Sequence, residues 1–433
     1  MLFGTEVFMK SFDEIKKCFS KADILLPDFE KVEGRRWSII ACDQFTSEPE
    51  YWEAVAERVG DSPSTLNLMI PEVYLSESAE RTERAHAAME DYLKNVLVRH
   101  PDSMIFVERT QPDGRVRRGI VGMVDLEEYE YTRGSEALIR ATEGTVLSRI
   151  PPRVAVRRDA LIELPHVMLL IDDPEKTVIE PLSKTAGDFA VAYDFDLMIG
   201  AGHIKGSFID LETQERVACA LARLASPEAM EKKYGDGTLA PLLFAAGDGN
   251  HSLATAKALF EEIKARDGEA AMQSAARYAL VEVVNLHDEA LDFEPIYRVV
   301  FNVNADDLLS ELKKYVSALD GKAHPQKMLS VIGEREEEIT VRAPIQQLTI
   351  GTLQAFLDEY SEKHPEIEVD YIHGEKALRT LAAKENAIGF LYDGMEKSEL
   401  FKTVIFDGAL PRKTFSMGHA KDKRFYLECR KIK

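Results

Sequence analysis

Apolar residues recur at two spacings along the chain, and each spacing predicts one type of element. Apolar positions three and four residues apart predict helices, whereas alternation or a short continuous apolar run predicts strands. Helices are expected over 78–99, 211–224, 350–360 and 375–385. Strands are expected over 22–27, 37–41, 277–286, 338–341, 368–372, 387–392 and 426–429. This pattern predicts an α+β fold.

Three pairs of apolar segments separated by short turns predict β-hairpins. They are 104–110 with 115–124, 166–171 with 177–180, and 196–199 with 207–209, the last around the glycine-rich segment 200–206. These hairpins predict a mixed β-sheet core, and a smaller C-terminal α/β unit is expected from about residue 300. We therefore divide the chain into an N-terminal α+β region (1–165), a strand-turn-helix region (166–300) and the C-terminal unit (301–433).

The segment 242–256 joins an apolar run, an Asp-Gly turn and the start of an amphipathic helix. A helix N-terminus has unpaired N–H groups and the positive end of the macrodipole, so it favours anions. Asp248 and His251 place two acid/base groups at this terminus. The pattern indicates nucleotide or phosphoryl chemistry. The alternative is a local role, because Asp, Gly and Asn are common turn and N-cap residues.

Composition narrows the classes of function. The 433 residues are 45% hydrophobic and 30% charged, which is typical of a folded protein of two or three domains. A net charge of −21 argues against binding to nucleic acid or anionic membranes. The four cysteines form no CxxC pair, no stretch is apolar enough to span a membrane, and no signal peptide pattern opens the chain. We expect a cytoplasmic protein that acts on a small molecule, with a homo-oligomer left open.

A second candidate feature is a basic segment in this acidic chain. Between Glu143 and Asp159 there is no acidic residue, and the arginines are Arg149, Arg153, Arg157 and Arg158. Arginine binds phosphate and carboxylate in a bidentate manner. The alternative is that these side chains pair with carboxylates of the chain itself. The Pro151-Pro152 pair predicts that the segment is a stiff loop.

Other polar positions offer weaker signals. Glu143 lies between Thr142 and Thr145, where its carboxylate could act as a general base. Asp43 follows a predicted buried strand, at the end where α/β sites often form. Lys205 lies in the glycine-rich turn, whose glycines allow close approach to a ligand. Neither GxxxxGK[ST] nor GxGxxG is present, which argues against Walker and Rossmann nucleotide sites.

The chain resembles the domain-of-unknown-function family 1015 over nearly its whole length. Four segments carry the resemblance: the turn Asp248-Gly249-Asn250-His251-Ser252 followed by Ala254-Thr255-Ala256, Glu143-Gly144-Thr145, Ala201-Gly202-His203-Ile204-Lys205-Gly206, and Pro411-Arg412-Lys413-Thr414. The turn is also similar to the nucleotide loop of the ParB/sulfiredoxin superfamily, which includes kinases that phosphorylate free serine. Asn250 and Ser252 stand where the family has histidine and arginine.

The resemblance implies a nucleotide-dependent phosphotransferase that uses ATP or ADP with Mg²⁺. Its acceptor would be a small hydroxylated metabolite, such as a free amino acid like serine. In this interpretation Glu143, Asp248 and His251 are catalytic, with Asp248 also holding the metal. The residues expected to bind the nucleotide are Gly249, Asn250, Ser252, Arg140, Arg149, Arg153, Arg157 and Lys205. The alternative is a regulatory protein that binds a nucleotide or metabolite without turnover.

Overall fold

Two units with separate internal contacts make up the protein. The computed structural model describes residues 11–145 and 147–433. The first unit contains the chain up to Ala141, Thr145–Leu291 and His419–Lys433, and the second contains Thr142–Gly144 and Asp292–Gly418. The division of the chain at residues 165 and 300 stays a prediction.

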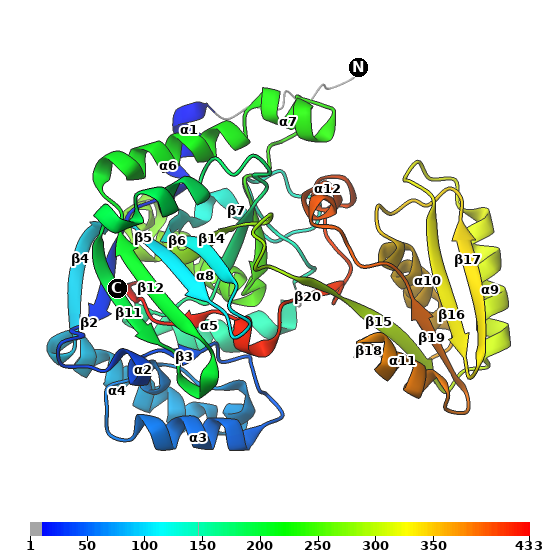
Figure 1. Cartoon of the computed structure of the whole chain (residues 1–433), viewed down its shortest axis with the longest axis horizontal. Helices are drawn as coiled ribbons and strands as arrows, with labels where there is room; N and C mark the ends of the chain where they lie inside the picture. Colours follow the sequence, from blue (N-terminus) through cyan, green and yellow to red (C-terminus); the bar gives the residue numbers. More distant parts are fainter. Residues whose placement is uncertain (1–10, 146) are drawn as a thin grey trace. The chain divides into compact units, whose positions relative to one another are not determined.

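A ten-stranded mixed sheet forms the centre of the first unit (Figure 1). Its strands are β1 (Phe19–Ser20), β5 (Ile105–Thr110), β6 (Val116–Asp125), β7 (Tyr129–Glu130), β8 (Ile139–Ala141), β10 (Met168–Ile171), β11 (Ala190–Asp196), β12 (His203–Phe208), β13 (Phe244–Asp248) and β14 (Tyr278–Asn285). The order is β11-β12-β5-β6-β14-β10-β13-β8-β7, and β1 pairs with β6. Because β10 runs parallel to β14 and antiparallel to β13, the expectation of a mixed sheet is confirmed.

Both faces of this sheet are buried. Along β14, Val281 and Val283 belong to the apolar core on one face, and Leu280 belongs to the core on the other. Alternate residues of a strand point to opposite faces, so a continuous apolar run such as this one suits a strand covered on both sides. The eight α-helices described in this unit are α1 (Phe12–Lys17), α2 (Gly34–Trp37), α3 (Pro49–Val59), α4 (Ser78–Asn95), α5 (Ile150–Arg158), α6 (Leu211–Leu224), α7 (Pro227–Tyr234) and α8 (Asn250–Asp267).

Two of the three predicted hairpins are confirmed. β5 pairs with β6, and β11 pairs with β12 in a register that joins Asp196 to His203, so the latter hairpin is longer than expected. The hairpin predicted over 166–180 is wrong. The carboxylate of Asp173 accepts hydrogen bonds from the amides of Thr177 and Val178, which closes a turn, and both edges of β10 pair with β13 and β14 instead.

Two helix boundaries differ from the sequence expectation. The segment with Pro151 and Pro152 is the start of α5 and not a loop. Proline has no backbone N–H, but the N–H groups of the first helical turn make no hydrogen bond within the helix, so proline is tolerated there. The helix expected to reach residue 99 ends at Asn95. The following residues form β4 (Leu97–Ser103), which pairs with β2 (Ala22–Pro27), so strand pairing overrides the helical spacing there.

The second unit is a smaller α/β structure, as predicted. Its six-stranded sheet has the order β17-β16-β19-β15-β18, and β20 pairs with β15. The strands are β15 (Phe293–Phe301), β16 (Gln326–Ile332), β17 (Arg335–Val341), β18 (Glu368–His373), β19 (Ala387–Leu391) and β20 (Phe415–Met417). Its helices are α9 (Ala305–Ala318), α10 (Thr349–Lys363), α11 (Glu375–Ala382) and α12 (Lys397–Asp407).

The C-terminal segment belongs to the first unit and forms two short strands in place of the single one predicted. β21 (Phe425–Tyr426) pairs with β3 (Ile39–Ile40), and β22 (Arg430–Lys431) pairs with β9 (Ile162–Glu163). Between them, the indole of Trp37 donates a hydrogen bond to the carbonyl of Leu427 at 2.9 Å. No helix within residues 11–145 and 147–433 is long and apolar enough to cross a membrane.

Candidate functional site

The junction of β13 and α8 has the strand-turn-helix form that the sequence predicts. Gly249 precedes the helix with φ +75°, and a Cβ atom there would lie 2.9 Å from the Cα of Val167, so glycine is required on both counts. The Asp248 carboxylate accepts a hydrogen bond from the Gly249 amide at 2.9 Å. The first turn of α8 itself contains no acidic residue, so Asp248 is the carboxylate that lies at the positive helix terminus.

A lysine from the C-terminal segment lies beside this turn. The Nζ atom of Lys423 is 3.3 Å from a carboxylate oxygen of Asp248, and both side chains are largely buried. The chain thus brings a cation and a carboxylate together where β13 ends and α8 begins. This pair was not predicted, because nothing local to either segment indicates it.

A chain of polar contacts connects the first turn of α8 to the loop after β3. His166 is 6% exposed, and its Nε2 atom lies 3.5 Å from the Ser252 hydroxyl and 3.7 Å from the Asp43 carboxylate. The other ring nitrogen, Nδ1, is 2.9 Å from the Tyr426 hydroxyl, which donates a hydrogen bond to the Cys42 sulfur at 3.1 Å. Four segments distant in sequence therefore meet at one histidine.

The charges around this histidine favour an ionised Asp43. Burial raises the pKa of the Asp43 carboxyl, but His166, a hydrogen bond from Gln44 and the charge of Lys423 together outweigh it, so the pKa is lowered. Asp43 is consequently a carboxylate at neutral pH. Burial raises the pKa of the neighbouring Cys42 to about 12, so its thiol stays protonated and is no nucleophile.

A cavity of about 590 Å³ opens beside these groups. Cys42, His166, Ser252 and Tyr426 supply polar atoms to its lining. Much of the remaining lining is apolar and includes Leu68, Met69, Met89, Val156, Leu164 and Leu280. Ligand sites commonly have this size and this mixture of apolar walls and a few convergent polar groups. The start of α8 therefore borders a space that can hold a small molecule.

The basic segment reaches the same cavity, where its arginines pair with carboxylates. Helix α5 packs on α8, and Ile150 and Val154 share an apolar cluster with Ala254 and Leu259. Arg153 bonds Glu72 at 2.7 Å, Arg157 bonds Glu163, and Arg158 bonds Glu262 at 2.8 Å. Arg153 and Arg157 line the cavity, so their ion pairs form part of its wall. The side chain of Arg149 lies outside the described residues.

Arg140 and Lys205, both predicted nucleotide contacts, lie outside the lining of this cavity, as do Gly249 and Asn250. Arg140 is 5% exposed and donates hydrogen bonds to the carbonyls of Ala137, Ala240 and Pro241, and burial lowers its pKa to about 10. A phosphate could bind the Arg140 guanidinium only if these hydrogen bonds were broken. Lys205 lies on β12 in register with Asp194 on β11 and Glu108 on β5, a position where opposite charges support the sheet.

The two predicted catalytic residues besides Asp248 are placed differently. His251 is the second residue of α8, and its carbonyl accepts a hydrogen bond from the Thr255 hydroxyl at 2.7 Å. Asn250 donates from its side-chain amide to the Ala246 carbonyl. Glu143 belongs to the second unit, where it forms a parallel bridge with Leu410. No group of three acidic, histidine or cysteine side chains that could hold a metal occurs within the described ranges.

His166, Lys423 and Tyr426 are the groups that sequence reasoning missed. His166 lies two residues before β10, Lys423 lies two residues before β21, and Tyr426 is the second residue of β21. Each has an ordinary local sequence. A usable signal existed only for Asp43, whose position after a buried strand had marked it as a candidate.

The fold and the site define an α+β protein, as predicted, with a mixed central sheet and a ligand-sized cavity at the start of a helix. The chain belongs to the family described as "Protein of unknown function (DUF1015)", whose sequence profile matches residues 27–391. The resemblance to that family is thereby confirmed. No curated protein matches the sequence.

Several solved structures are similar to this chain. A mutant free serine kinase in complex with AMP is 11% identical with a TM-score of 0.38, and the match covers 74% of this chain and 92% of the kinase. The ADP complex of a mutant free serine kinase is also 11% identical, with a TM-score of 0.37 and coverage of 74% and 93%. A conserved hypothetical protein from Pyrococcus furiosus is 12% identical, with a TM-score of 0.33 and coverage of 72% and 94%.

Proposed function

We propose that the first unit binds the phosphates of a nucleotide at the start of α8 and transfers a phosphoryl group to a small hydroxylated metabolite. One observation carries this proposal. Ser252, in the first turn of α8, lines the 590 Å³ cavity together with His166. The amides of a first helical turn have no carbonyl partner within the helix, and the macrodipole adds positive potential there.

The charged groups of the site have roles that suit phosphoryl transfer, which depends mainly on positioning and charge stabilisation. Lys423 would neutralise phosphate charge beside the helix terminus. Asp43, which is ionised and linked to His166, would accept a hydrogen bond from the acceptor hydroxyl. The apolar walls of the cavity would enclose the less polar part of the ligand and exclude water.

A magnesium ion would accompany a nucleotide in this site. Mg²⁺ is usually held by one or two carboxylates together with substrate phosphates, and it keeps several waters. Asp248 fits this pattern as a single carboxylate ligand beside the phosphate-binding terminus. When bound, the ion would neutralise charge on the phosphates.

A second candidate function is nucleotide or metabolite binding without turnover. Arg153 and Arg157, which were expected to neutralise phosphate charge, are held by Glu72 and Glu163. Ser252 also stands where the family has arginine. A site with less positive charge supports binding better than it supports catalysis, because the charge of the transition state must be stabilised.

Ligand binding and transfer are tested in sequence. Thermal melting with ATP, ADP or CTP, each with and without Mg²⁺, identifies the nucleotide. Transfer of labelled phosphate to serine and to a panel of hydroxylated metabolites then separates catalysis from sensing. Stabilisation without transfer would favour the sensing function. The absence of both would contradict the proposal.

One substitution targets the phosphate site itself. Ser252→Asp places a carboxylate in the first turn of α8. The carboxylate stabilises the helix through its interaction with the helix dipole, but it repels phosphate. We expect an unchanged or higher melting temperature and nucleotide binding at least about tenfold weaker. Ser252→Asn, which adds bulk without charge, is the matched control. Equal losses from both variants would show that space, not charge, determines binding there.

A further inference from the structure

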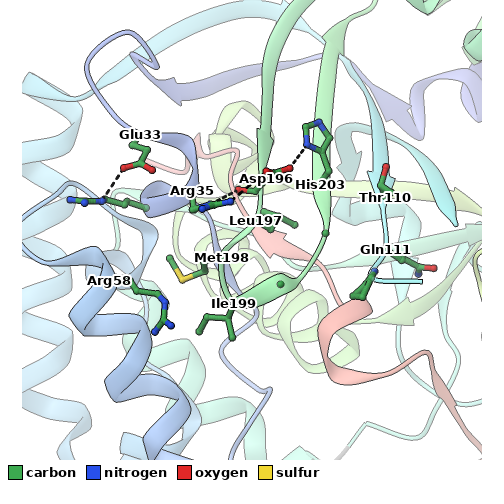
Figure 2. A pocket seen from close by; sticks show the side chains of 14 residues that line it. Glu33, Arg35, Arg58, Thr110, Gln111, Asp196, Leu197, Met198, Ile199 and His203 are labelled. Atoms are coloured by element: carbon green, nitrogen blue, oxygen red, sulfur yellow. Dashed lines mark hydrogen bonds and ion pairs between the residues drawn. The ribbon is translucent and has the colours of Figure 1, made fainter. Parts of the chain in front are cut away.

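A second cavity in the first unit is lined by arginines. Its volume is about 650 Å³, and it lies among α2, α3, the β5–β6 turn and the β11–β12 turn (Figure 2). Arg35 and Arg36 come from α2, and Arg58 comes from α3. No described residue lines both this arginine cleft and the cavity at α8. The cleft is therefore a separate feature of the unit.

Two of the three arginines of the cleft, Arg35 and Arg58, make only weak contacts with the protein, whereas Arg36 pairs with Glu33 at 3.0 Å. Arg58 donates a hydrogen bond to the carbonyl of Ala54 in its own helix, and no carboxylate within residues 11–145 and 147–433 forms an ion pair with it. Arg35 lies 3.4 Å from Asp196, and both side chains are more than half exposed. Exposed ion pairs of this kind contribute little stability, so an incoming anion can replace the carboxylate.

The wall opposite these arginines is a turn held in an unfavourable conformation. Ile199 has φ +55° and ψ +36°, a left-handed conformation that is unusual for a β-branched residue. Nearby, a Cβ atom on Gly202 would lie 2.2 Å from the carbonyl oxygen of Thr110, so the turn is pressed against the end of β5. Backbone conformations of this kind are concentrated at ligand sites.

The turn also gives the cleft an apolar side. Figure 2 shows Arg35 and Arg58 facing the turn that carries Met198 and Ile199. Asp196, which pairs with Arg35, is further held by the imidazole of His203 at 2.9 Å. A ligand with a charged end and a short carbon skeleton would contact both kinds of surface.

We propose that the arginine cleft binds a small organic oxyanion with two or more negative charges. Arg35 and Arg58 supply two guanidinium groups, which bind phosphates and carboxylates in the same bidentate manner. The anion displaces Asp196 from Arg35, and its carbon skeleton lies on Met198 and Ile199. This inference is independent of the phosphotransferase proposal because the two sites have no residue in common.

Isothermal titration calorimetry with pyrophosphate and, separately, with citrate tests the proposal on the whole protein. The titrations are made in the Ser252→Asp background, in which an anion is repelled from α8, and at physiological ionic strength. We expect one anion to bind per chain. Binding of pyrophosphate alone indicates a phosphate-bearing ligand, binding of citrate alone indicates a polycarboxylate, and binding of both indicates recognition of charge. Binding of neither at millimolar concentration overturns the proposal.

Variants then locate the bound anion. The double variant Arg35→Gln/Arg58→Gln is expected to bind at least about tenfold more weakly. Arg84→Gln removes an exposed α4 arginine outside the cleft, and we expect it to change nothing. Equal binding by the double variant overturns the proposal. Protection of Arg58 from phenylglyoxal by the anion, followed by mass spectrometry, gives a readout on the unaltered protein, and an unprotected Arg58 also overturns it.

Discussion

The ammonium group of Lys423 lies 3.3 Å from the carboxylate of Asp248, although the two residues come from distant segments of the chain. The contact joins the segment before β21 to the turn that opens α8. The ammonium group of Lys423 thus lies where a phosphate would meet the start of α8. The first prediction concerns this cation.

If the start of α8 binds phosphate as proposed, Lys423→Met is expected to weaken nucleotide binding about tenfold, because the substitution removes a cation beside the phosphate and leaves Asp248 without this ion pair. Lys421→Met is the control. It removes the same charge from an exposed side chain two residues away. Calorimetric titration with the nucleotide that stabilises the protein measures both. Equal effects from the two variants would contradict a specific role for Lys423.

The lowered pKa of Asp43 predicts the pH dependence of stability. A carboxyl group whose pKa is lower in the folded protein than in the unfolded chain contributes stability above the unfolded value, here 3.8, and the contribution is lost as the pH falls through the folded value. The difference in unfolding free energy between the wild type and Asp43→Asn should therefore be constant at neutral pH and shrink below about pH 4. Urea unfolding at a series of pH values measures it. A difference that grows on acidification would show that the pKa is raised.

Alanine substitutions at two glycines with the same φ distinguish the cost of a steric contact from the cost of the backbone conformation. Gly114 and Gly202 both have φ +89°, but a Cβ atom on Gly114 would meet nothing within 4 Å, whereas one on Gly202 would lie 2.2 Å from the Thr110 carbonyl oxygen. Gly114→Ala should cost about 1–2 kcal/mol for the left-handed conformation. Gly202→Ala should cost about 1–3 kcal/mol more because of the added contact. Urea unfolding of the two variants gives the comparison, and equal costs would contradict the close approach of the two turns.

Buried and exposed arginine–carboxylate pairs should differ strongly in their contribution to stability. Arg430 and Glu163 pair at 2.8 Å with side chains that are 5% and 4% exposed, whereas the Arg99–Asp23 pair is largely exposed. Arg430→Met should destabilise the protein by about 3–5 kcal/mol because Glu163 remains buried with less compensation. Arg99→Met should cost about 0–1 kcal/mol. Equilibrium denaturation of both variants checks the contrast, and a small effect of Arg430→Met would argue against it.

The raised pKa of Cys42 predicts a slow thiol in the folded protein. With a pKa of about 12 against an ordinary value of 9.0, the thiolate fraction at neutral pH is lower by about a thousandfold. Iodoacetamide should therefore alkylate Cys42 slowly in buffer and rapidly in urea, as followed by mass spectrometry. Similar rates in the two conditions would show that the thiol is accessible and ionised.

Local rules predicted the parts of the fold that short segments determine. The Asp-Gly turn before α8 needs a positive φ at Gly249, and the β5–β6 hairpin has a turn sequence between two apolar runs. The Asp-Gly pair and the hairpin's turn sequence can both be recognised in the sequence alone. The hairpin predicted over 166–180 failed because β10 has more extensive partners elsewhere in the chain, and the choice between partners depends on packing that no local pattern contains.

The candidate site was predictable only in part, for the same reason. The start of α8, with Ser252 in its first turn, follows from spacing alone. His166, Asp43 and Tyr426 come from three other segments, and their approach to one another depends on the order of strands in the sheet and on the return of the chain after the second unit. The pairing of Arg153 and Arg157 with glutamates likewise depends on where α5 packs.

The last residues of the chain supply Lys423 and Tyr426 to the site and two strands to the first unit. During synthesis, these residues leave the ribosome only after the whole second unit has been made. The nascent first unit therefore lacks Lys423, Tyr426 and the strands β21 and β22 until the second unit has been made, so the first unit completes its fold only after the second has been synthesised.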